Sequence, residues 1–531
     1  MSNQAAEAPK NRAGMDRRDF LRGAALVGTA GAATTLFGCG QPQTAKGAKA
    51  DGADAAASEP TPDSMEQCDI VIVGAGMSGL SAAVQAGLNG DKVVMLESTA
   101  NVGGSGFGVE GIFGWNTKMQ QEQGISFDKS LVLKSELASS NYGADGALWE
   151  ELVDASAENI DWLVEQGVTF SGLVDAYEVK GTSGIVPSMH WFEEGIAAVG
   201  YVPAMQKRCE ELGVDIRTET RAIALAMDGE TVRGVYAEAA DGIVKFESKA
   251  VIIASGSWQS DEDMLVKYGF DPLFTINANV SDQDGSGFRM AMSAGGKEFT
   301  RPCVEGVTGL PGLSFDHSVL VQALGLGNAC VWLNDEGRRF TNEDSNAVNF
   351  ELPVTTILNQ RKAYTLFTRG IAEAALREFG ADSAELDQWA QGGIDGVWTG
   401  GGIAELAEAA GINADVLQAT VDEYNEFCRQ GADASFGKDP SLLVEIADGP
   451  FYLARISIAV DVVIGGITTD RDYRVVDSAW NPIDGLYAVG VSGCMLYRDV
   501  YPIDVCATAC QNSIHSGRRA AMHAHDSIAH M

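Results

Sequence analysis

The chain has 531 residues and is 45% hydrophobic, so it can bury the cores of two or three domains. A formal net charge of -36 argues against nucleic acids and anionic membrane surfaces as partners, and leaves small molecules and basic proteins. After residue 40, no stretch holds the roughly 20 consecutive apolar residues that a membrane span requires.

Residues 1–38 are predicted to be an export signal. Arg17 and Arg18 stand in the run DRRDFLR, and an apolar stretch of small residues follows from Gly23 to Gly38. This order is typical of a twin-arginine signal peptide. Cys39 ends the run LFGC, which resembles a lipoprotein box, so we expect export to the periplasm or cell surface and a lipid anchor on Cys39. Residues 39–65 lack periodicity and predict a flexible tether.

The next segment predicts a nucleotide-binding unit. An apolar strand, residues 69–73, leads into the GxGxxG glycines Gly74, Gly76 and Gly79, and a second strand ends on Glu97 and Ser98. The glycines permit a tight turn, the approach of a pyrophosphate and close packing of helix on strand. An acid at the position of Glu97 accepts hydrogen bonds from the adenosine ribose.

Further motifs follow along the chain. They are the loop Gly103-Gly104-Ser105-Gly106, the apolar strand KAVIIASG at 249–256 with Ala254, Ser255 and Gly256, the run SDQDG at 281–285, NDEGRRFTNE at 334–343, and GLYAVG at 485–490 before a helix expected to begin near Val505. Helices are also predicted over 371–379 and 414–429, with glycine-rich turns between them.

Together these motifs resemble the flavoprotein family that contains fumarate reductase, urocanate reductase and 3-ketosteroid 1-dehydrogenase. The resemblance implies an α/β fold, in which a Rossmann-like FAD-binding domain carries an inserted α+β cap domain. We place the FAD-binding domain at 66–305 and 462–531, and the cap, which would close over the flavin, at 306–461.

The resemblance also implies where FAD would bind. The residues expected to hold it are Gly74, Gly76, Gly79, Glu97, Ser98, Gly103, Gly104, Ser105, Gly106, Ala222, Ala254, Ser255, Gly256, Asp284, Gly490, Val505 and Cys506. Some relatives carry a histidine that binds FAD covalently at the position of Ser105, so a non-covalent cofactor is expected here. No metal site is predicted.

Three groups that handle the anionic substrate in fumarate reductases are missing. Ala347 stands at the position of the proton-donating arginine, Val462 replaces a histidine, and Tyr501 replaces a second arginine. Because a dicarboxylate would lose its ion pairs in such a site, fumarate is not the expected substrate.

Tyr501-Pro502 matches the place where 3-ketosteroid dehydrogenases have a tyrosine that hydrogen-bonds the substrate ketone. A phenol can donate one hydrogen bond to a carbonyl oxygen and stays protonated at neutral pH. We therefore predict Tyr501, with Arg498, Asp499 and Glu343, as catalytic residues, where Glu343 belongs to a supporting network. Tyr142 and His190 are weaker candidates.

The sequence thus predicts an exported FAD-dependent reductase of a carbon–carbon double bond conjugated to a carbonyl group, an enoate or an enone. Hydride would come from the flavin, and electrons from a separate membrane or cytochrome donor. Two alternatives stay open: a desaturase of the 3-ketosteroid 1-dehydrogenase type, and a surface flavoprotein that transfers electrons without a substrate of its own.

Overall fold

The computed structural model describes residues 59–177, 184–278, 283–313, 318–325, 329–345 and 352–530. The predicted export signal, Cys39, Ser281, Asp282 and Ala347 lie outside the described residues. Residues 59–531 form one unit of the chain. No helix in the described part of the chain is long and apolar enough to cross a membrane.

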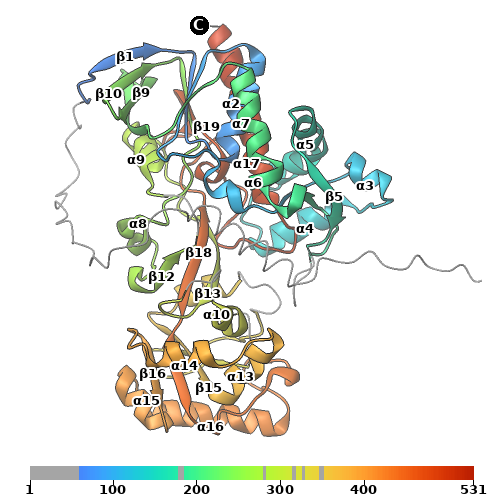
Figure 1. Cartoon of the computed structure of the whole chain (residues 1–531), viewed down its shortest axis with the longest axis vertical. Coiled ribbons are helices and arrows are strands. Elements are labelled where there is room, and N and C mark those ends of the chain that lie inside the picture. The colour runs from blue at the N-terminus through green and yellow to red at the C-terminus, as the bar shows by residue number, and fades with distance from the viewer. Residues whose placement is uncertain are drawn as a thin grey trace, which may run out of the picture. The chain divides into compact units, whose positions relative to one another are not determined.

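A six-stranded sheet forms the centre of the nucleotide-binding part (Figure 1). Its neighbours pair in parallel, except for β19, which is antiparallel to β20. The predicted strands at 69–73, 249–256 and 485–490 are adjacent in it, although they are far apart in sequence. In sheet order the strands are β19 (Arg474–Val476), β20 (Pro482–Ala488), β11 (Ala250–Ile253), β2 (Ile70–Val73), β3 (Val93–Leu96) and β7 (Asp215–Arg217).

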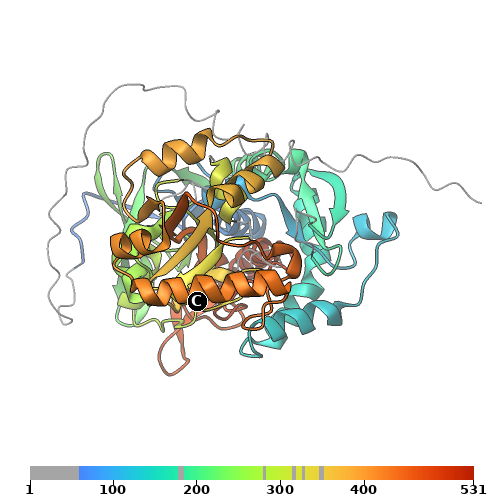
Figure 2. The ribbon, with the colours of Figure 1, turned by 90° about the horizontal axis from the view of Figure 1, so that it is seen from below.

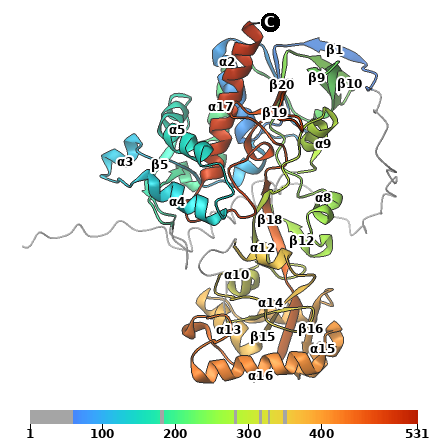
Figure 3. The same ribbon diagram turned by 180° about the vertical axis from the view of Figure 1, so that it is seen from behind.

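The two faces of this sheet are covered by different layers. Ile70 and Ile72 of β2 pack against helices α2 (Met77–Asn89), α7 (Val202–Glu211) and α17 (Thr508–Ala529). Val71 and Val73 point to the other face, where a second sheet covers them. Figure 3 shows α2 and α17 side by side. The second sheet has the order β1 (Ser64–Gln67), β10 (Gly242–Glu247), β9 (Thr231–Ala239) and β8 (Arg221–Asp228).

Helix α17 begins at Thr508, three residues later than the sequence suggested. Ala507 precedes it in the left-handed conformation, with φ 60°, which interrupts a helix for a residue with a side chain. Val505 and Cys506 therefore lie in the turn before the helix and not in its first turn.

A small sheet and several helices flank the nucleotide-binding part. The sheet has the order β4 (Gly111–Phe113), β6 (Met189–Phe192) and β5 (Phe170–Asp175). Between β4 and β5 the chain forms α3 (Lys118–Glu122), α4 (Lys129–Ser139) and α5 (Gly146–Glu165), and after β6 it forms α6 (Ala197–Gly200). Two short helices, α8 (Glu262–Lys267) and α9 (Ser286–Ser293), follow the strand β11.

The predicted cap segment has its own sheet and its own core. The predicted helices at 371–379 and 414–429 correspond to α13 (Arg369–Glu378) and α16 (Ala414–Gln430), and Figure 2 shows α16 crossing the lower face. In sheet order the strands are β14 (Val331–Asn334), β15 (Ala363–Thr368), β17 (Phe451–Arg455) and β16 (Val397–Gly400). The remaining helices are α10 (Val319–Gly325), α12 (Leu352–Leu358), α14 (Ala384–Gln391) and α15 (Ile403–Ala410).

Two long strands join the cap segment to the nucleotide-binding part (Figure 1). They are β13 (Cys303–Gly309) and β18 (Ser457–Ile464), which pair antiparallel and, with β12 (Thr275–Asn277), form a three-stranded sheet. The predicted domain boundaries at 305/306 and 461/462 fall inside these strands. The register shifts between Glu305 and Gly306: Glu305 opposes Val462 and Gly306 opposes Val460, so Asp461 is an extra residue in a β-bulge.

Candidate active site

The glycine turn leaves room for a phosphate at the start of α2. A Cβ on Gly74 would lie 2.5 Å from the Ala254 carbonyl oxygen, and a Cβ on Gly79 only 2.0 Å from the oxygen of Gly74. A Cβ on Gly76, in contrast, would meet nothing closer than the Gly103 oxygen at 3.9 Å. Gly76 is also the N-cap of α2 and offers no side-chain cap, so free amide groups and open space coincide, as a bound phosphate requires.

The Glu97 carboxylate connects the glycine turn to the loop after β3. Its Oε2 accepts a hydrogen bond from the amide of Ala75 at 3.0 Å, and its Oε1 accepts from the amide and hydroxyl of Thr99, both at 2.9 Å. Ser98 Oγ lies 3.5 Å from the same Oε1. Glu97 is 8% exposed and directly follows β3, where the predicted ribose contact would be made.

The second glycine loop lies directly beside the first. Gly103 forms a parallel bridge with Gly76, and its amide donates to the Ala75 oxygen at 2.8 Å. Ser105 accepts a hydrogen bond from Gln283 Nε2 at 3.0 Å. Gln283 also packs against Gly256, where a Cβ would lie 2.1 Å from the Gln283 Oε1. Four separate stretches of predicted FAD-binding residues thus meet at one end of the sheet.

The other predicted cofactor residues lie around the same end. Asp284 forms an ion pair with Arg221, next to the buried Ala222. Burial pushes the pKa of Asp284 up, but hydrogen bonds from Ser286 and the charge of Arg221 outweigh it and hold the pKa below its ordinary value. Gly490, with φ 61°, packs on α2, where a Cβ would lie 2.4 Å from the Ser78 Oγ. The side chain of Ser255 packs against Gly287. Val505 and Cys506 are buried in apolar clusters.

Tyr501 and Val462, which are expected to stand where fumarate reductases have an arginine and a histidine, lie in one apolar cluster. Tyr501 is 6% exposed and meets the Tyr497 ring edge-on at 4.9 Å. Tyr497 in turn hydrogen-bonds Thr508, at the start of α17, at 2.6 Å. The structure therefore brings Tyr501 and Val462 together next to the helix expected to face the flavin.

The charged neighbours of Tyr501 have other contacts. Asp499, with φ 62°, pairs with Arg301, whose Nε lies 3.0 Å from Oδ1. The guanidinium of Arg498 lies 4.3 Å from the centre of the Phe299 ring. Burial, and then the nearby charge of Arg301, lowers the pKa of Arg498. Catalytic roles for Arg498 and Asp499 stay predictions.

Glu343 belongs to a buried charge network in the cap segment. It is 1% exposed and accepts hydrogen bonds from Arg339, at 2.8 and 3.0 Å, and from the Trp332 amide at 3.0 Å. Arg339 also bonds Asp433 at 2.9 Å, and the Lys438 ammonium lies 3.5 Å from Glu343. These contacts agree with the expected supporting role and give no contact with Tyr501.

The two weaker candidates differ in their surroundings. His190 is fully buried, with Nε2 2.7 Å from the Thr117 hydroxyl and Nδ1 2.9 Å from the Ser188 oxygen. Burial lowers its pKa to about 4, so the ring is neutral at physiological pH. Tyr142 is 73% exposed on the loop between α4 and α5. The surroundings of His190 and Tyr142 do not indicate a catalytic role for either residue.

Sequence reasoning missed three acids, Glu110, Glu305 and Asp461. Burial, followed by the charges of Asp461 and Glu110, raises the pKa of Glu305 to about 8. Burial also raises the pKa of Glu110 to about 7, against a hydrogen bond with Tyr177. A signal was present: Asp461 is the one charged residue in the strand SIAVDVVI, and Glu305 the one in CVEGVTG.

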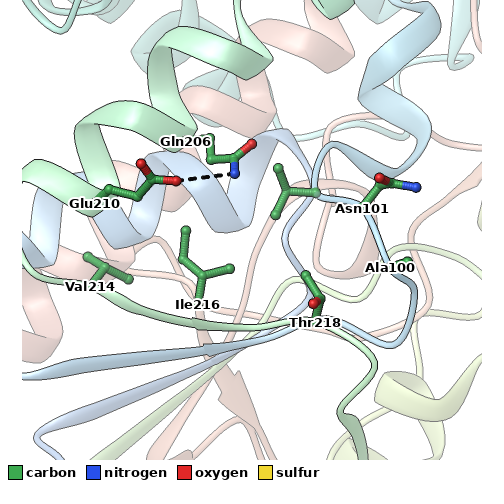
Figure 4. A pocket seen from close by; sticks show the side chains of 8 residues that line it. Ala100, Asn101, Gln206, Glu210, Val214, Ile216 and Thr218 are labelled. Carbon is green, nitrogen blue, oxygen red and sulfur yellow. Dashed lines mark hydrogen bonds between the residues drawn. The ribbon is translucent and has the colours of Figure 1, made fainter.

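A separate hollow of about 320 Å³ is lined in part by residues 100–102 of the loop after β3 (Figure 4). Gln206 and Glu210 reach into it from α7, with Gln206 Nε2 3.3 Å from the Glu210 Oε1. None of the predicted site residues lines it, so this hollow is not the predicted cofactor site. Its lining is Ala100, Asn101, Val102, Gln206, Glu210, Val214, Ile216 and Thr218.

Comparison with known proteins agrees with this geometry. The sequence matches the family described as FAD binding domain (FAD_binding_2) over residues 69–503. It is 28% identical to vinyl phenol reductase from Lactiplantibacillus plantarum, over 86% of this chain and 96% of that protein. It is 26% identical to fumarate reductase (cytochrome) from Shewanella frigidimarina, over 80% of this chain and 71% of that protein.

A solved structure shows the same fold. The 3-ketosteroid delta1-dehydrogenase from Sterolibacterium denitrificans superposes with a TM-score of 0.66 and 17% identity, and the match covers 87% of this chain and 100% of that chain. The matches confirm the predicted fold class and FAD as the cofactor. Its non-covalent attachment and the individual site residues stay predictions.

Proposed function

The chain belongs to the FAD_binding_2 family and is an FAD-dependent oxidoreductase, and from this premise we propose that it reduces a carbon–carbon double bond conjugated to a carbonyl group. The family includes reductases of carbon–carbon double bonds, as the names of its relatives state. An enone or an enoate is the proposed substrate class.

One observation carries this proposal: Tyr501 and Val462 share an apolar cluster with Cys303, Ile464 and Ala509. A dicarboxylate bound against such side chains would lose its hydration without gaining ion pairs, at a cost of several kcal/mol per charge. A carbonyl compound needs a single hydrogen bond there, and a phenol can donate it. The apolar neighbours would also keep water away from the reacting carbons.

The roles of the residues follow from this placement. When bound, FAD supplies the hydride equivalent that a double bond needs for reduction. Gly76 and the uncapped amides of α2 would hold its pyrophosphate. The first turn of α17 would stabilise negative charge at the far end of the cofactor. The Tyr501 hydroxyl would donate to the carbonyl oxygen and draw electron density from the conjugated double bond.

A specific observation favours a second candidate, the reduction of alkenyl phenols. The match to vinyl phenol reductase spans 86% of this chain and 96% of that protein. A desaturase of the 3-ketosteroid 1-dehydrogenase type rests on the shared fold and on Tyr501. A flavoprotein that only transfers electrons would use none of the Tyr501 cluster.

We further propose that the protein is exported by the twin-arginine route, anchored through Cys39 and supplied with electrons by a separate cytochrome. The name of the Shewanella frigidimarina relative supports a cytochrome as donor. The net charge of -36 favours a donor with a basic face, so electron transfer to this protein should slow as salt increases. Treatment of cells with globomycin, which blocks lipoprotein processing, tests whether Cys39 carries the proposed lipid anchor.

The substrate class is tested with FAD-loaded protein reduced anaerobically by dithionite. Steroid enones, cinnamate, urocanate and 4-vinylphenol are added singly, and the return of oxidised flavin absorbance is followed. An enone or enoate should gain two hydrogen atoms across its double bond. Tyr501→Phe should slow that reaction about 10- to 100-fold, because the negative charge that develops on the carbonyl oxygen loses one hydrogen bond. Tyr236→Phe is the matched control, because Tyr236 lies in the second sheet and its hydroxyl donates to Glu59.

Different outcomes separate the candidates. Reaction with 4-vinylphenol and with no carbonyl compound would favour the alkenyl phenol reductase. Bleaching of oxidised flavin by saturated ketosteroids would favour the desaturase. If no compound reoxidised or bleached the flavin, electron transfer alone would remain.

A further inference from the structure

The three missed acids share one place, at the β-bulge between β13 and β18. Glu305 directly opposes Val462 in this antiparallel pair, and directly opposed residues project their side chains from the same face. The next such pair, Cys303 and Ile464, also lies on that face. Because Val462, Cys303 and Ile464 pack in the Tyr501 cluster, the Glu305 side chain projects on the side of Tyr501.

The bulge brings a second acid to the same side. In a regular strand, Asp461 would point away from its neighbour Val462. As the extra residue of a bulge, Asp461 points its side chain in a different direction. This agrees with the effect of its negative charge on the pKa of Glu305. Asp461 is exposed within a strand whose other seven residues are buried. Gln259, 2% exposed, donates to the Asp461 carbonyl at 3.0 Å, and its Oε1 has no hydrogen-bond partner among the described residues.

The third acid comes from the glycine loop that would lie along the flavin. Glu110 follows Gly106 by four residues and shares a hydrogen bond with Tyr177, whose ring stacks on Trp191 at 5.6 Å. Cys510, in the first turn of α17, is close to all three acids: burial and then the charges of Glu305, Glu110 and Asp461 raise its pKa. Glu110 thus comes from the glycine loop, Glu305 and Asp461 come from the strand pair beside the Tyr501 cluster, and the charges of all three act on Cys510 at the start of α17.

The surroundings of Glu305 favour the protonated acid. Its charged neighbours are the carboxyls of Asp461 and Glu110, and no lysine or arginine among the described residues offsets them. Glu110 in turn faces Asp175 and Tyr177. Burial is the largest cause of the raised pKa of Glu305, yet the side chain keeps part of its surface accessible. An enclosed but reachable neutral carboxyl is suited to giving a proton to a ligand.

We propose that Glu305 is the proton donor of the reaction, in the role that the absent arginine fills in fumarate reductases, with Asp461 and Glu110 as positioning residues that hold the proton on it. This inference rests on the proposed function. When bound, the reduced cofactor would supply a hydride to one carbon of the double bond. At the adjacent carbon the O–H bond of Glu305 breaks and a C–H bond forms with the electron pair of the π bond. Glu305 is left as a carboxylate and takes its next proton from water.

The main test is the single-turnover reoxidation of dithionite-reduced, FAD-loaded protein by the substrate that the panel identifies. The wild-type rate should fall as pH rises through about 8. Glu305→Gln, which cannot donate a proton, should slow the step about 100-fold or more and flatten this pH profile, with an unchanged dissociation constant for the substrate. Glu305→Asp should recover part of the rate. Glu238→Gln, an exposed acid of β9, is the matched control.

Asp461→Asn tests the positioning role. Removing one negative neighbour lowers the pKa of Glu305, so the fall in rate should move to lower pH while the rate at acidic pH is retained. A merely structural role for Asp461 would change the rate at every pH by the same factor.

Infrared difference spectra supply a readout that needs no turnover. At neutral pH, the difference spectrum of wild type minus Glu305→Gln should show the carbonyl stretch of a protonated carboxyl, and this difference band should fade as the pH rises through about 8. Absence of this band, or a Glu305→Gln enzyme with the wild-type rate and pH profile, would overturn the assignment. If the band is present but no alkene reoxidises the wild-type flavin, the proposed function fails while Glu305 still holds the proton.

Discussion

The carboxylate of Glu97 accepts a hydrogen bond at 3.0 Å from the backbone amide of Ala75, which lies inside the glycine turn. The acid at the end of β3 is therefore also a support for the turn that would cradle the pyrophosphate. Its other oxygen accepts two bonds from the amide and hydroxyl of Thr99, in the loop after β3. Glu97 thus ties the glycine turn to the loop that follows β3.

Glu97→Ala should weaken FAD binding about 10- to 100-fold, because the Ala75 and Thr99 amides lose a charged acceptor and the turn loses its brace. Titration of apoprotein with FAD, followed by flavin fluorescence, measures the dissociation constant. Glu238→Ala controls for loss of an exposed acid. Equal affinity in Glu97→Ala and wild type would show that the turn holds its shape without this carboxylate.

Two alanine substitutions in the glycine turn should have opposite consequences. Gly79→Ala would place a Cβ 2.0 Å from the Gly74 oxygen, so the folded protein should be destabilised even without cofactor. Gly76→Ala has 3.9 Å of clearance and a negative φ, so its apoprotein should melt like wild type but fail to bind FAD. Thermal unfolding of both apoproteins and FAD titration check the pair. Equal melting of the two variants would contradict the geometry.

His190 should make stability depend on pH. Its pKa in the folded protein, about 4, lies below its ordinary value of 6.5, so the unfolded chain binds more protons between these values. This contribution to stability is therefore fully present above about pH 6.5 and is lost as the pH falls through about 4, by about 3 kcal/mol in total. His190→Gln should lose this part of the pH dependence. Melting temperatures of both proteins at several pH values between these limits give the comparison.

Removing Glu343 should destabilise the cap segment strongly. Glu343→Ala leaves Arg339 in a buried site with one acid fewer, which costs about 3–5 kcal/mol. Glu336→Ala is the matched control, because Glu336 pairs with Arg338 at 3.9 Å on the surface and should melt like wild type. Differential scanning calorimetry with FAD titration distinguishes the two roles: a supporting residue changes melting and leaves FAD affinity unaltered.

Much of the nucleotide-binding part could be predicted from sequence, because its signals are local. The glycines, the acid after the second strand and the apolar runs of β2 and β11 each mark their own place, and α16 follows from its apolar spacing. The start of α17 could not be read in this way. The sequence from Val505 to Thr508 looks helical, and only the left-handed conformation of Ala507 delays the helix.

The acids of the site were missed for a different reason. Glu305 and Asp461 are more than a hundred residues apart, and one extra residue in a strand decides which face Asp461 occupies. A period-two pattern places Asp461 opposite to Val462. Register shifts depend on pairing with a distant strand, so no local pattern predicts them.

Strand β17 ends at Arg455 and β18 begins at Ser457, with Ile456 alone between them. A strand of the cap sheet and the strand that carries Asp461 therefore follow each other with a single residue between them. The ladder between β13 and β18 ties Glu305 to the strand that carries Asp461, so the two acids would keep their spacing when the cap moves.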